Sequence, residues 1–489
     1  MSAPVLRHPD CLYIDGAWVE PHSGRQLEIV SPDTEQVVAR VAEADETDMD
    51  RAVAAARKAF DEGPWPWFSP AERIAAMERL VEALRKREPE LAAAWSLQMG
   101  GLATLAPFLV SRGTQNLQDA IDIGRSFEFV RRAETPVVAA GFIVHEPVGV
   151  VAAIAPWNVP YMIMAGKVAP ALLAGCTLIM KPSPETPLEA YIITECAEEA
   201  GLPPGVINLV PGHRDAADHL VCNPGVDKVS FTGSTLAGKR IAEVCGSRIA
   251  RCTLELGGKS AAVVLDDFSA DEAAKVLAGA ITLVSGQVCA MLTRAIVPRH
   301  RHDEIADAIA SEMQKVRIGH SDDAEAQMGP LAMQRQLERV EGYIAAGKKE
   351  GADLVTGGGR PSQLNNGYFF EPTLFANVRN DMKIAQEEIF GPVLGLIPCD
   401  DLDDAIRIAN QSNYGLNGSV LTHDADQAWK VARRVRAGNV AQNGMKNDFS
   451  LPFGGYKQSG IGREGGTQGL MHYLETKTIM LDAEPASPV

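Results

Sequence analysis

The sequence predicts an α/β protein with two domains and a small β extension, and three observations support this class. The chain has 489 residues, too many for one hydrophobic core. From residue 148 onward, apolar strand-like runs alternate with helix-like runs over short connections, which favours parallel sheets with right-handed crossovers. A second alternating block starts near Ser260, where Gly257 and Gly258 mark the joint. We therefore expect one parallel sheet in each domain.

The predicted elements follow one another in a regular order. The N-terminal part mixes short strand-like pieces with a helix over 44–60, and two helices with apolar positions at a period of 3.6 residues follow within 70–100. A charged break at Arg131 and Arg132 precedes extended strands. The first block then predicts strands over 148–156, 176–183, 205–212, 226–234 and 249–258, and helices over 161–175, 187–201 and 235–246.

The second block runs to about Asn439, and the chain closes with "GLMHYLETKTIML", which predicts a short helix and a strand. That strand has few neighbours left in its own chain. We therefore expect it to pair with another subunit.

Composition excludes several classes of protein. The apolar fraction of 46% and the charged fraction of 22% are those of an ordinary globular protein. A net charge of −17 argues against binding to nucleic acids and to anionic membrane surfaces. The apolar run from Val148 to Met180 is long enough to suggest a membrane span, but three prolines interrupt it, so a buried strand and helix explain it better.

The N-terminus and the cysteines indicate a cytoplasmic location. The first residues, "MSAPVLRHPDCLYIDGAWVE", contain no apolar stretch of the kind found in signal peptides. The eight cysteines form no C-x-x-C pair and no regular framework, which suits reduced thiols in the cytosol.

Three side chains are candidates for chemistry. Cys289, in "SGQVCAMLTR", is either a buried structural thiol or a nucleophile, and a nucleophilic thiol needs help from its surroundings because its ordinary pKa is near 8.5. Glu255 ends an apolar strand before two glycines, where a partly buried carboxylate could act as a general base. Asn158, in "APWNVP", follows a strand where open α/β sheets bind ligands, and its amide could stabilise an oxyanion; the alternative is a turn asparagine.

Two further stretches are candidate ligand sites. "FTGSTLAGK" places Gly233 at a strand-to-helix junction, where helix N–H groups could bind a pyrophosphate, although the spacing is not that of a dinucleotide fingerprint. His300 and His302 form an H-x-H pair in a polar stretch that predicts a solvated turn or a helix start, and no third ligand stands at a useful spacing. We predict no metal site.

Taken together, these stretches resemble the aldehyde dehydrogenase superfamily. The resemblance covers nearly the whole chain, and the motifs stand in the family's order: "PWNVP", "KPSPETPL", "FTGSTLAG", "LELGGKS", "GQVC", "EEIFGPV", "PFGGYKQSGIGREGG" and "YLETKT". One such motif could arise by chance, whereas eight in order are specific.

The resemblance implies a fold and a domain arrangement. It implies a Rossmann-like dinucleotide-binding domain from 1–130 and 147–256, and a second α/β catalytic domain over 257–440. The segments 131–146 and 470–489 would be oligomerisation strands. A homodimer or homotetramer is expected.

The resemblance also implies a role for each matching residue. Cys289 would attack an aldehyde to form a thiohemiacetal, Asn158 with the Cys289 backbone N–H would form the oxyanion hole, and Glu255 would activate the water that hydrolyses a thioester. Lys167 and Glu464 would be a buried charged pair able to relay protons. The implied cofactor-binding residues are Ile154, Pro156, Trp157, Lys181, Gly233, Ser234, Leu256, Glu388 and Phe390.

The implied reaction is the NAD(P)-dependent oxidation of an aldehyde to a carboxylate. Two alternatives stay open: a CoA-acylating aldehyde dehydrogenase, against which Glu255 counts, and a non-catalytic binding or structural protein on the same fold. NAD is the favoured cofactor and NADP the alternative, because Pro184 stands where many NAD-preferring relatives have a glutamate, with Glu185 beside it.

The substrate pocket also departs from several relatives. Val159 stands where some have an aromatic residue, and Gly166 stands where some have tryptophan, which implies room near the thiol for a bulky or apolar aldehyde. Val288 and Ala290 flank the nucleophile. The side chains expected either to wall this pocket or simply to pack the core are Met162, Met164, Met445 and Phe449.

Overall fold

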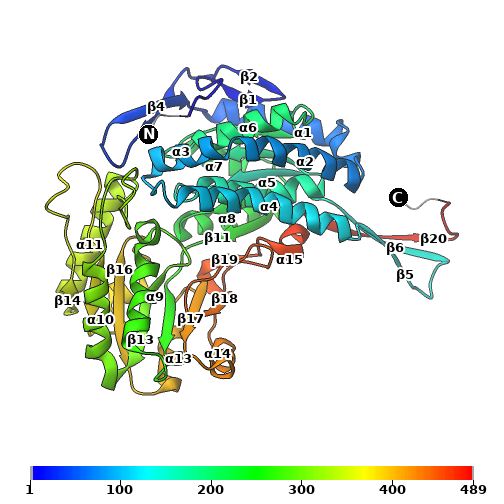
Figure 1. Ribbon diagram of the computed structural model, residues 1–489. Helices are drawn as coiled ribbons and strands as arrows, with labels where there is room; N and C mark the ends of the chain where they lie inside the picture. The colour runs from blue at the N-terminus through cyan, green and yellow to red at the C-terminus, as the bar shows by residue number, and fades with distance from the viewer. Residues whose placement is uncertain (1–3, 487–489) are drawn as a thin grey trace.

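The structure, a computed structural model, describes residues 4–486 and confirms the predicted α/β class. Two large sheets, each covered by helices on both faces, form the two domains, and a three-stranded arm extends from the first (Figure 1). The expected domain and arm ranges begin at residue 1 and end at residue 489, so residues 1–3 and 487–489 of those ranges lie outside the described part.

The first sheet has eight strands in the order β19-β11-β10-β7-β8-β9-β1-β2. Its five central strands are parallel, and an antiparallel strand pairs at each side of them. The strands of this sheet are β1 Leu12–Ile14, β2 Ala17–Val19, β7 Val150–Ile154, β8 Thr177–Lys181, β9 Ile207–Leu209, β10 Lys228–Thr232, β11 Arg251–Glu255 and β19 Gly460–Ile461. β3 Gln26–Val30 and β4 Val37–Ala42 form a separate two-stranded ribbon.

Helices cover both faces of this sheet because successive residues of each strand point to opposite sides. Val151 and Ala153 of β7 pack in one apolar cluster with α2 to α6, whereas Val150 and Ala152 pack in another with α1, α7 and α8. The helices are α1 Glu46–Asp61, α2 Pro70–Lys86, α3 Glu88–Met99, α4 Ala106–Ser126, α5 Pro160–Ala174, α6 Leu188–Glu199, α7 Arg214–Cys222 and α8 Thr235–Arg248.

The second sheet has seven strands in the order β14-β15-β16-β13-β12-β17-β18, all parallel except the β14–β15 pair. Its strands are β12 Ser260–Val264, β13 Leu292–Pro298, β14 Asp353–Thr356, β15 Thr373–Ala376, β16 Val393–Cys399, β17 Asn417–Leu421 and β18 Asn439–Gln442. Its helices are α9 Ala270–Thr282, α10 His302–Gln314, α11 Gln334–Glu350, α12 Lys383–Gln386, α13 Leu402–Asn410 and α14 Ala425–Ala432.

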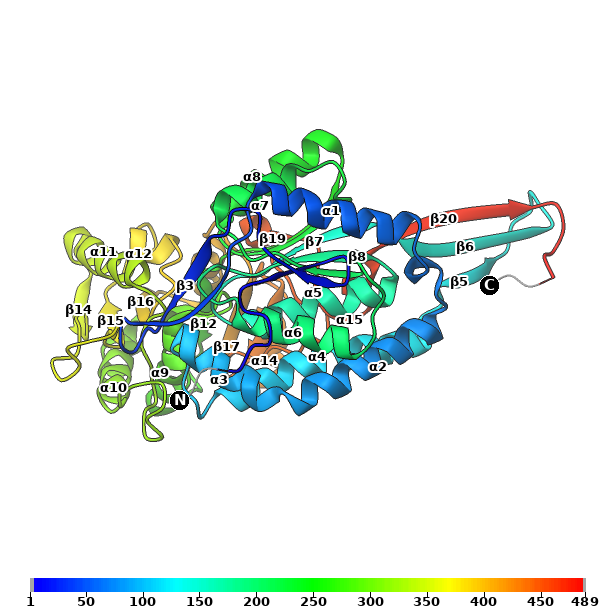
Figure 2. The same cartoon turned by 90° about the horizontal axis from the view of Figure 1, so that it is seen from above.

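After β18 the chain returns to the first domain. No local pattern in the sequence predicted this return. β19 pairs with β11, and α15 Gly466–Met471 packs against α4 and α5. In Figure 2 the arm projects from this domain as a twisted ribbon.

The arm corrects one expectation about the last strand. β20 Leu474–Leu481 pairs along its whole length with β6 Ala140–Pro147 of its own chain, and β6 pairs in turn with β5 Val130–Ala133. The expectation of few neighbours overlooked β6, because this partner strand lies more than three hundred residues away in sequence. β20 is nevertheless an edge strand, with one side unpaired among the described residues.

The apolar run at 148–180 folds as the strand β7, the helix α5 and the strand β8, as predicted. Within residues 4–486, no helix has both the length and the apolar character that a membrane crossing requires.

Candidate active site

A cavity of about 1000 Å³, lined by both domains, brings the three candidate catalytic side chains together. Asn158 follows β7 and Glu255 ends β11, so both lie at the carboxyl end of the first sheet. Cys289 comes from the segment between α9 and β13 of the second domain. All three line the same cavity, although they are remote in the sequence.

The turn before Cys289 has an unusual backbone that explains its glycine. Val284, Ser285 and Gly286 have consecutive positive φ angles of 50°, 54° and 74°. A Cβ on Gly286 would lie 2.3 Å from the backbone of Gly391, so only glycine fits there. Such backbone strain is found at functional sites that the surrounding structure holds in place.

Gln287 holds this turn against two other segments. Its buried side chain donates to the carbonyl of Val284 at 3.1 Å and accepts from the backbone N–H of Ala332 at 2.9 Å. Ser285 donates to the carbonyl of Gly329 at 2.8 Å. These hydrogen bonds therefore fix the position of the backbone that carries the Cys289 thiol.

The surroundings of Cys289 favour the protonated thiol. Burial raises its pKa to about 12, and the nearby carboxylates of Glu388 and Glu255 act in the same direction. The backbone N–H groups of Ala290 and of Cys289 itself oppose this shift. A nucleophilic role therefore requires a base that removes the proton when substrate is present.

Asn158 is buried and held on two sides. The indole N–H of Trp95 donates to its main-chain carbonyl at 2.9 Å, and its own Nδ2 donates to the carbonyl of Gln287 at 2.8 Å. The Oδ1 atom has no hydrogen-bond partner. Because Nδ2 carries two hydrogens, one remains for a ligand.

Glu255 is buried, and neither carboxylate oxygen has a hydrogen-bond partner in the part of the chain that the structure describes. Burial and the neighbouring carboxylate of Glu464 raise its pKa well above the ordinary value, and the charges of Lys167 and Arg463 only partly offset this. Lys167 Nζ donates to Glu464 Oε1 at 2.5 Å. An unpaired carboxyl with a raised pKa is suited to proton transfer near neutral pH.

The implied cofactor residues gather at the carboxyl ends of adjacent parallel strands. They end or directly follow β8, β7, β10 and β11, which are neighbours in the sheet. Ser234 caps α8 by accepting from the N–H of Ala237 at 3.3 Å, so the first turn of α8 faces this edge. The residues placed here are Ile154, Pro156, Trp157, Lys181, Gly233, Ser234 and Leu256.

Glu388 and Phe390 approach this edge from the second domain. Glu388 Oε1 accepts from the N–H of Gly258 at 3.1 Å, and a Cβ on Gly257 would lie 2.5 Å from the same carboxylate. The rings of Phe390 and Trp157 meet edge to face at 5.3 Å. Burial raises the pKa of Glu388 to about 7.

Two residues of α11 position the loop that carries Glu388 and Phe390, and the sequence did not predict this role for them. Gln336 of α11 donates to the carbonyls of Ile389 and Phe390 at 3.1 and 2.6 Å, and Arg339 donates to that of Ile389 at 3.0 Å. The sequence of α11 is that of an ordinary amphipathic helix, so no local pattern distinguishes Gln336 and Arg339 from the other polar residues of this helix.

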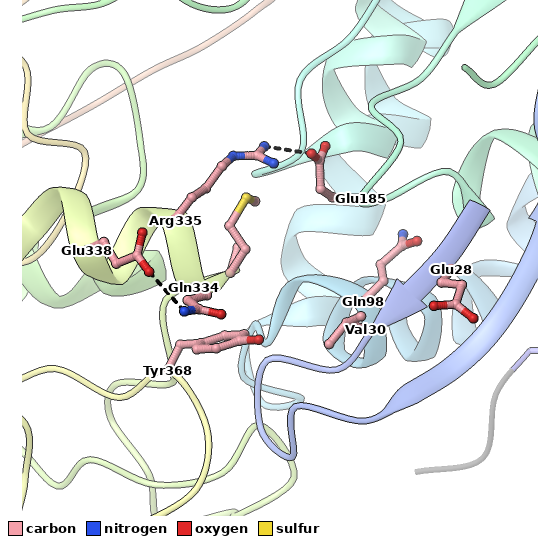
Figure 3. Close-up of a pocket in the computed structure, with 10 residues that line it drawn as sticks. Glu28, Val30, Gln98, Glu185, Gln334, Arg335, Glu338 and Tyr368 are labelled. Carbon is pink, nitrogen blue, oxygen red and sulfur yellow. Dashed lines mark hydrogen bonds and ion pairs between the residues drawn. The ribbon is translucent and has the colours of Figure 1, made fainter. Parts of the chain in front are cut away.

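The side-chain ammonium of Lys181 has no hydrogen bond or ion pair within residues 4–486, and burial lowers its pKa to about 8. The carboxylate of Glu185, four residues later, forms an ion pair of 2.6 Å with Arg335 of α11, and both side chains line a pocket of about 510 Å³ (Figure 3). Although burial of Glu185 acts to raise its pKa, the charge of Arg335 and a hydrogen bond from Ser183 lower it overall.

The buried unpaired ammonium of Lys181, the free N–H groups at the start of α8 and the half-buried carboxylate of Glu388 suit a dinucleotide. They match, in that order along the sheet edge, a ribose, a pyrophosphate and a second ribose. The residues present therefore fit the cofactor that the sequence resemblance implied.

The cavity wall follows the sequence expectation, with one exception. Met164 packs in the core of the first domain and does not reach the cavity. The other expected residues line it: Val159, Met162, Gly166, Val288, Ala290, Met445 and Phe449.

The H-x-H stretch is a helix start, as predicted, since α10 begins at His302. His302 is buried, and its ring bonds Asp303 and the N–H of Asn377. Across residues 4–486, no group of three or more His, Cys, Asp or Glu side chains is arranged to hold a metal ion.

Comparison with known proteins gives consistent matches over nearly the whole chain. The model of the "Aldehyde dehydrogenase family" matches residues 18–479. A geranial dehydrogenase of Castellaniella defragrans is 42% identical over 471 residues, covering 96% of this chain and 98% of that protein. These similarities extend to the fold.

Two solved structures superpose closely. An aldehyde dehydrogenase of Mycobacterium tuberculosis complexed with NAD⁺ is 41% identical, with a TM-score of 0.93 and coverage of 98% of this chain and 99% of that one. A mutant of aldehyde dehydrogenase C of Pseudomonas syringae, complexed with NAD⁺ and octanal, is 40% identical, with a TM-score of 0.95 and full coverage of both chains.

Proposed function

The chain belongs to the aldehyde dehydrogenase family, and from this premise we propose that it oxidises an aldehyde to a carboxylate through a covalent intermediate on Cys289. The enzyme is NAD-dependent. The observation that carries the proposal is the convergence of Cys289, Glu255 and Asn158 on one cavity. This cavity lies at the carboxyl edge of the first sheet, where the implied cofactor-binding residues also lie.

The first step is attack of the Cys289 sulfur on the aldehyde carbon. The sulfur–carbon bond forms as the thiol proton passes to a water molecule in the cavity, and the carbonyl oxygen becomes the oxyanion of a thiohemiacetal. The free N–H of Asn158 and the backbone N–H of Cys289 donate to that oxygen. An oxyanion-hole donor of this kind contributes about 2.7–4 kcal/mol to transition-state stabilisation.

NAD, when bound, supplies an acceptor for the hydride that the thiohemiacetal carbon loses. Lys181 and the first turn of α8 would hold its adenosine ribose and pyrophosphate, and Glu388 and Phe390 would hold the nicotinamide ribose and ring. Ile154, Pro156, Trp157 and Leu256 would line the path between them.

The second step is hydrolysis of the resulting thioester on Cys289. Glu255 removes a proton from a water molecule as that water attacks the acyl carbon, and the sulfur leaves with the electron pair of the broken bond. The unbonded oxygens of Glu255 leave it free to accept this proton. The buried pair of Lys167 and Glu464 lies beside it as a route for passing the proton on.

We further propose that the unpaired edge of β20 joins the arm of a second copy, giving a homodimer or homotetramer. A free strand edge of eight residues presents a row of unpaired backbone groups that a second strand can satisfy. Besides a second copy of the chain, we propose the aldehyde substrate as a binding partner.

The test is a pair of measurements on Cys289→Ala and the unmodified enzyme. The variant should form no NADH with any aldehyde but should bind NAD as tightly as the unmodified enzyme. Turnover by the variant would refute the nucleophile. The unmodified enzyme should form NADH equally with and without CoA, whereas a strict requirement for CoA would indicate an acylating enzyme.

A further inference from the structure

The catalytic cavity continues well beyond the thiol, along one face of α4. The α4 residues that line it recur every three or four positions from Phe108 to Ile123, which marks a single helix face. At a rise of about 1.5 Å per residue, this face is about 22 Å long. A small aldehyde held at Cys289 would contact only part of it.

Gly166 of α5 keeps the passage open at its middle. A Cβ placed on Gly166 would have only one neighbour within 4 Å, Asn116 Nδ2 at 3.6 Å. Two glycines of α4 behave differently, because a Cβ on Gly113 or Gly124 would lie 2.6 or 2.4 Å from the side chain of Tyr161 or Leu173. The helices α4 and α5 are therefore in close contact at both ends of this interface and apart at Gly166.

The part of the cavity beyond Gly166 has aliphatic walls. We call it the far limb, and its apolar lining residues are Ala120, Ile123, Pro170, Leu173 and Leu470. The polar side chains beside it have partners, since Asp119 accepts from Gln115 Nε2 at 2.8 Å and Asn116 Nδ2 donates to the carbonyl of Met162 at 3.1 Å. Each of these two polar side chains therefore has a hydrogen-bond partner within the protein.

Resting on the proposed oxidation at Cys289, we propose that the substrate is a long apolar aldehyde whose hydrocarbon tail passes Gly166 and lies in the far limb. The cavity of about 1000 Å³ is at the upper end of the range for small-molecule sites. Each methylene buried against these walls should raise kcat/KM by about fourfold. Gly166 is then the residue that sets the accepted chain length.

The proposal is tested with Gly166→Leu, which fills the passage. We expect kcat/KM of the unmodified enzyme to rise from propanal through hexanal to dodecanal. In Gly166→Leu, the ratio of kcat/KM for dodecanal to that for propanal should fall by about 50-fold, equivalent to about three buried methylenes. Gly246→Leu is the matched control, because Gly246 is an exposed helical glycine with nothing within 4 Å of its Cβ.

Binding of dodecan-1-ol without cofactor gives a readout that does not depend on turnover. The unmodified protein and Gly246→Leu should bind it, and Gly166→Leu should bind it at least about 10-fold more weakly. Equal binding by all three proteins, a flat chain-length profile, or a preference for amino-aldehydes would overturn the proposal. Absence of NADH with every aldehyde, combined with the expected dodecanol pattern, would instead refute the proposed function and leave the far limb as an apolar binding site.

Discussion

The side-chain amide of Asn158 donates a hydrogen bond of 2.8 Å to the carbonyl oxygen of Gln287, two residues before Cys289. This bond joins the loop after β7 in the first domain to the rigid turn that carries the thiol. It also orients the amide, so that its second N–H is directed by the protein before any substrate arrives. Preorganised donors of this kind stabilise developing charge without reorganising during the reaction.

Replacing Asn158 should therefore cost catalysis more than binding. We expect Asn158→Ala to lower kcat by about 10²–10³-fold while the Kd for NAD changes little, because only the oxyanion loses a donor. Single-turnover NADH formation measures the chemical step directly. A loss of less than about threefold would mean that the backbone N–H of Cys289 acts alone.

Glu255 should separate the two chemical steps. In Glu255→Gln the side chain keeps its shape but cannot accept a proton, so the thioester should form and then persist. We expect a burst of NADH of one equivalent per active site followed by slow turnover, and an acyl group on Cys289 detectable by mass spectrometry after acid quenching. Unchanged steady-state turnover at neutral pH would contradict the base assignment.

The affinity for NAD should depend on pH through Glu388. Burial raises the pKa of this carboxyl to about 7, and only its ionised form is the strong acceptor that ribose hydroxyls prefer. The proton must leave before NAD binds well, so the Kd for NAD should fall as pH rises from about 6 to about 8. Calorimetric titration across this range measures it, and Glu388→Gln should give weaker binding that does not vary with pH. The same pH dependence in that variant would assign the titration to another group.

Removing one member of the buried pair of Lys167 and Glu464 should lower the free energy of unfolding more than replacing both by apolar residues. Lys167 is fully buried and Glu464 nearly so. Lys167→Met leaves an uncompensated carboxylate in the interior, which should lower the free energy of unfolding by about 3–5 kcal/mol. The double variant Lys167→Met/Glu464→Leu should recover much of this loss. Denaturant unfolding of the two variants checks the order, and equal destabilisation by both would show that the charge is not the cause.

The fold was predictable from sequence wherever neighbouring elements in the chain are neighbours in space. The runs at 148–156 and 161–175 alternate as strand and helix, and the structure has β7 and α5 there. The pairing of β20 with β6 was not predictable, because the register between segments so far apart depends on the tertiary fold. The return of 440–470 to the first sheet was missed for the same reason.

The candidate site was predictable to the level of residue type and position at strand ends. Asn158 and Glu255 follow strands that the apolar runs identify, and both line the cavity. The partners that position them could not be found this way. Gln287 is one glutamine in a short loop, and only the folded structure shows that its side chain ties the thiol turn to Ala332.

The pairing of Glu185 with Arg335 should influence the choice between NAD and NADP. Arg335 neutralises a carboxylate whose charge also acts on Lys181, the residue implied to hold the adenosine ribose. In Arg335→Ala that carboxylate becomes uncompensated and should repel a 2′-phosphate more than a hydroxyl, so the ratio of kcat/KM for NADP to that for NAD should fall by about fivefold, roughly 1 kcal/mol.

Two further variants make this prediction specific. Glu185→Gln removes the charge and should shift the ratio the other way, towards NADP. Arg317→Ala removes an equally exposed arginine from a surface ion pair with Asp323 and should leave the ratio unchanged. The pocket in Figure 3 gives Arg335 room to approach Glu185 from α11, so loss of the arginine should change the local charge without disturbing the core. If Arg335→Ala and Arg317→Ala give the same ratio, the discrimination between the two dinucleotides lies elsewhere on the sheet edge.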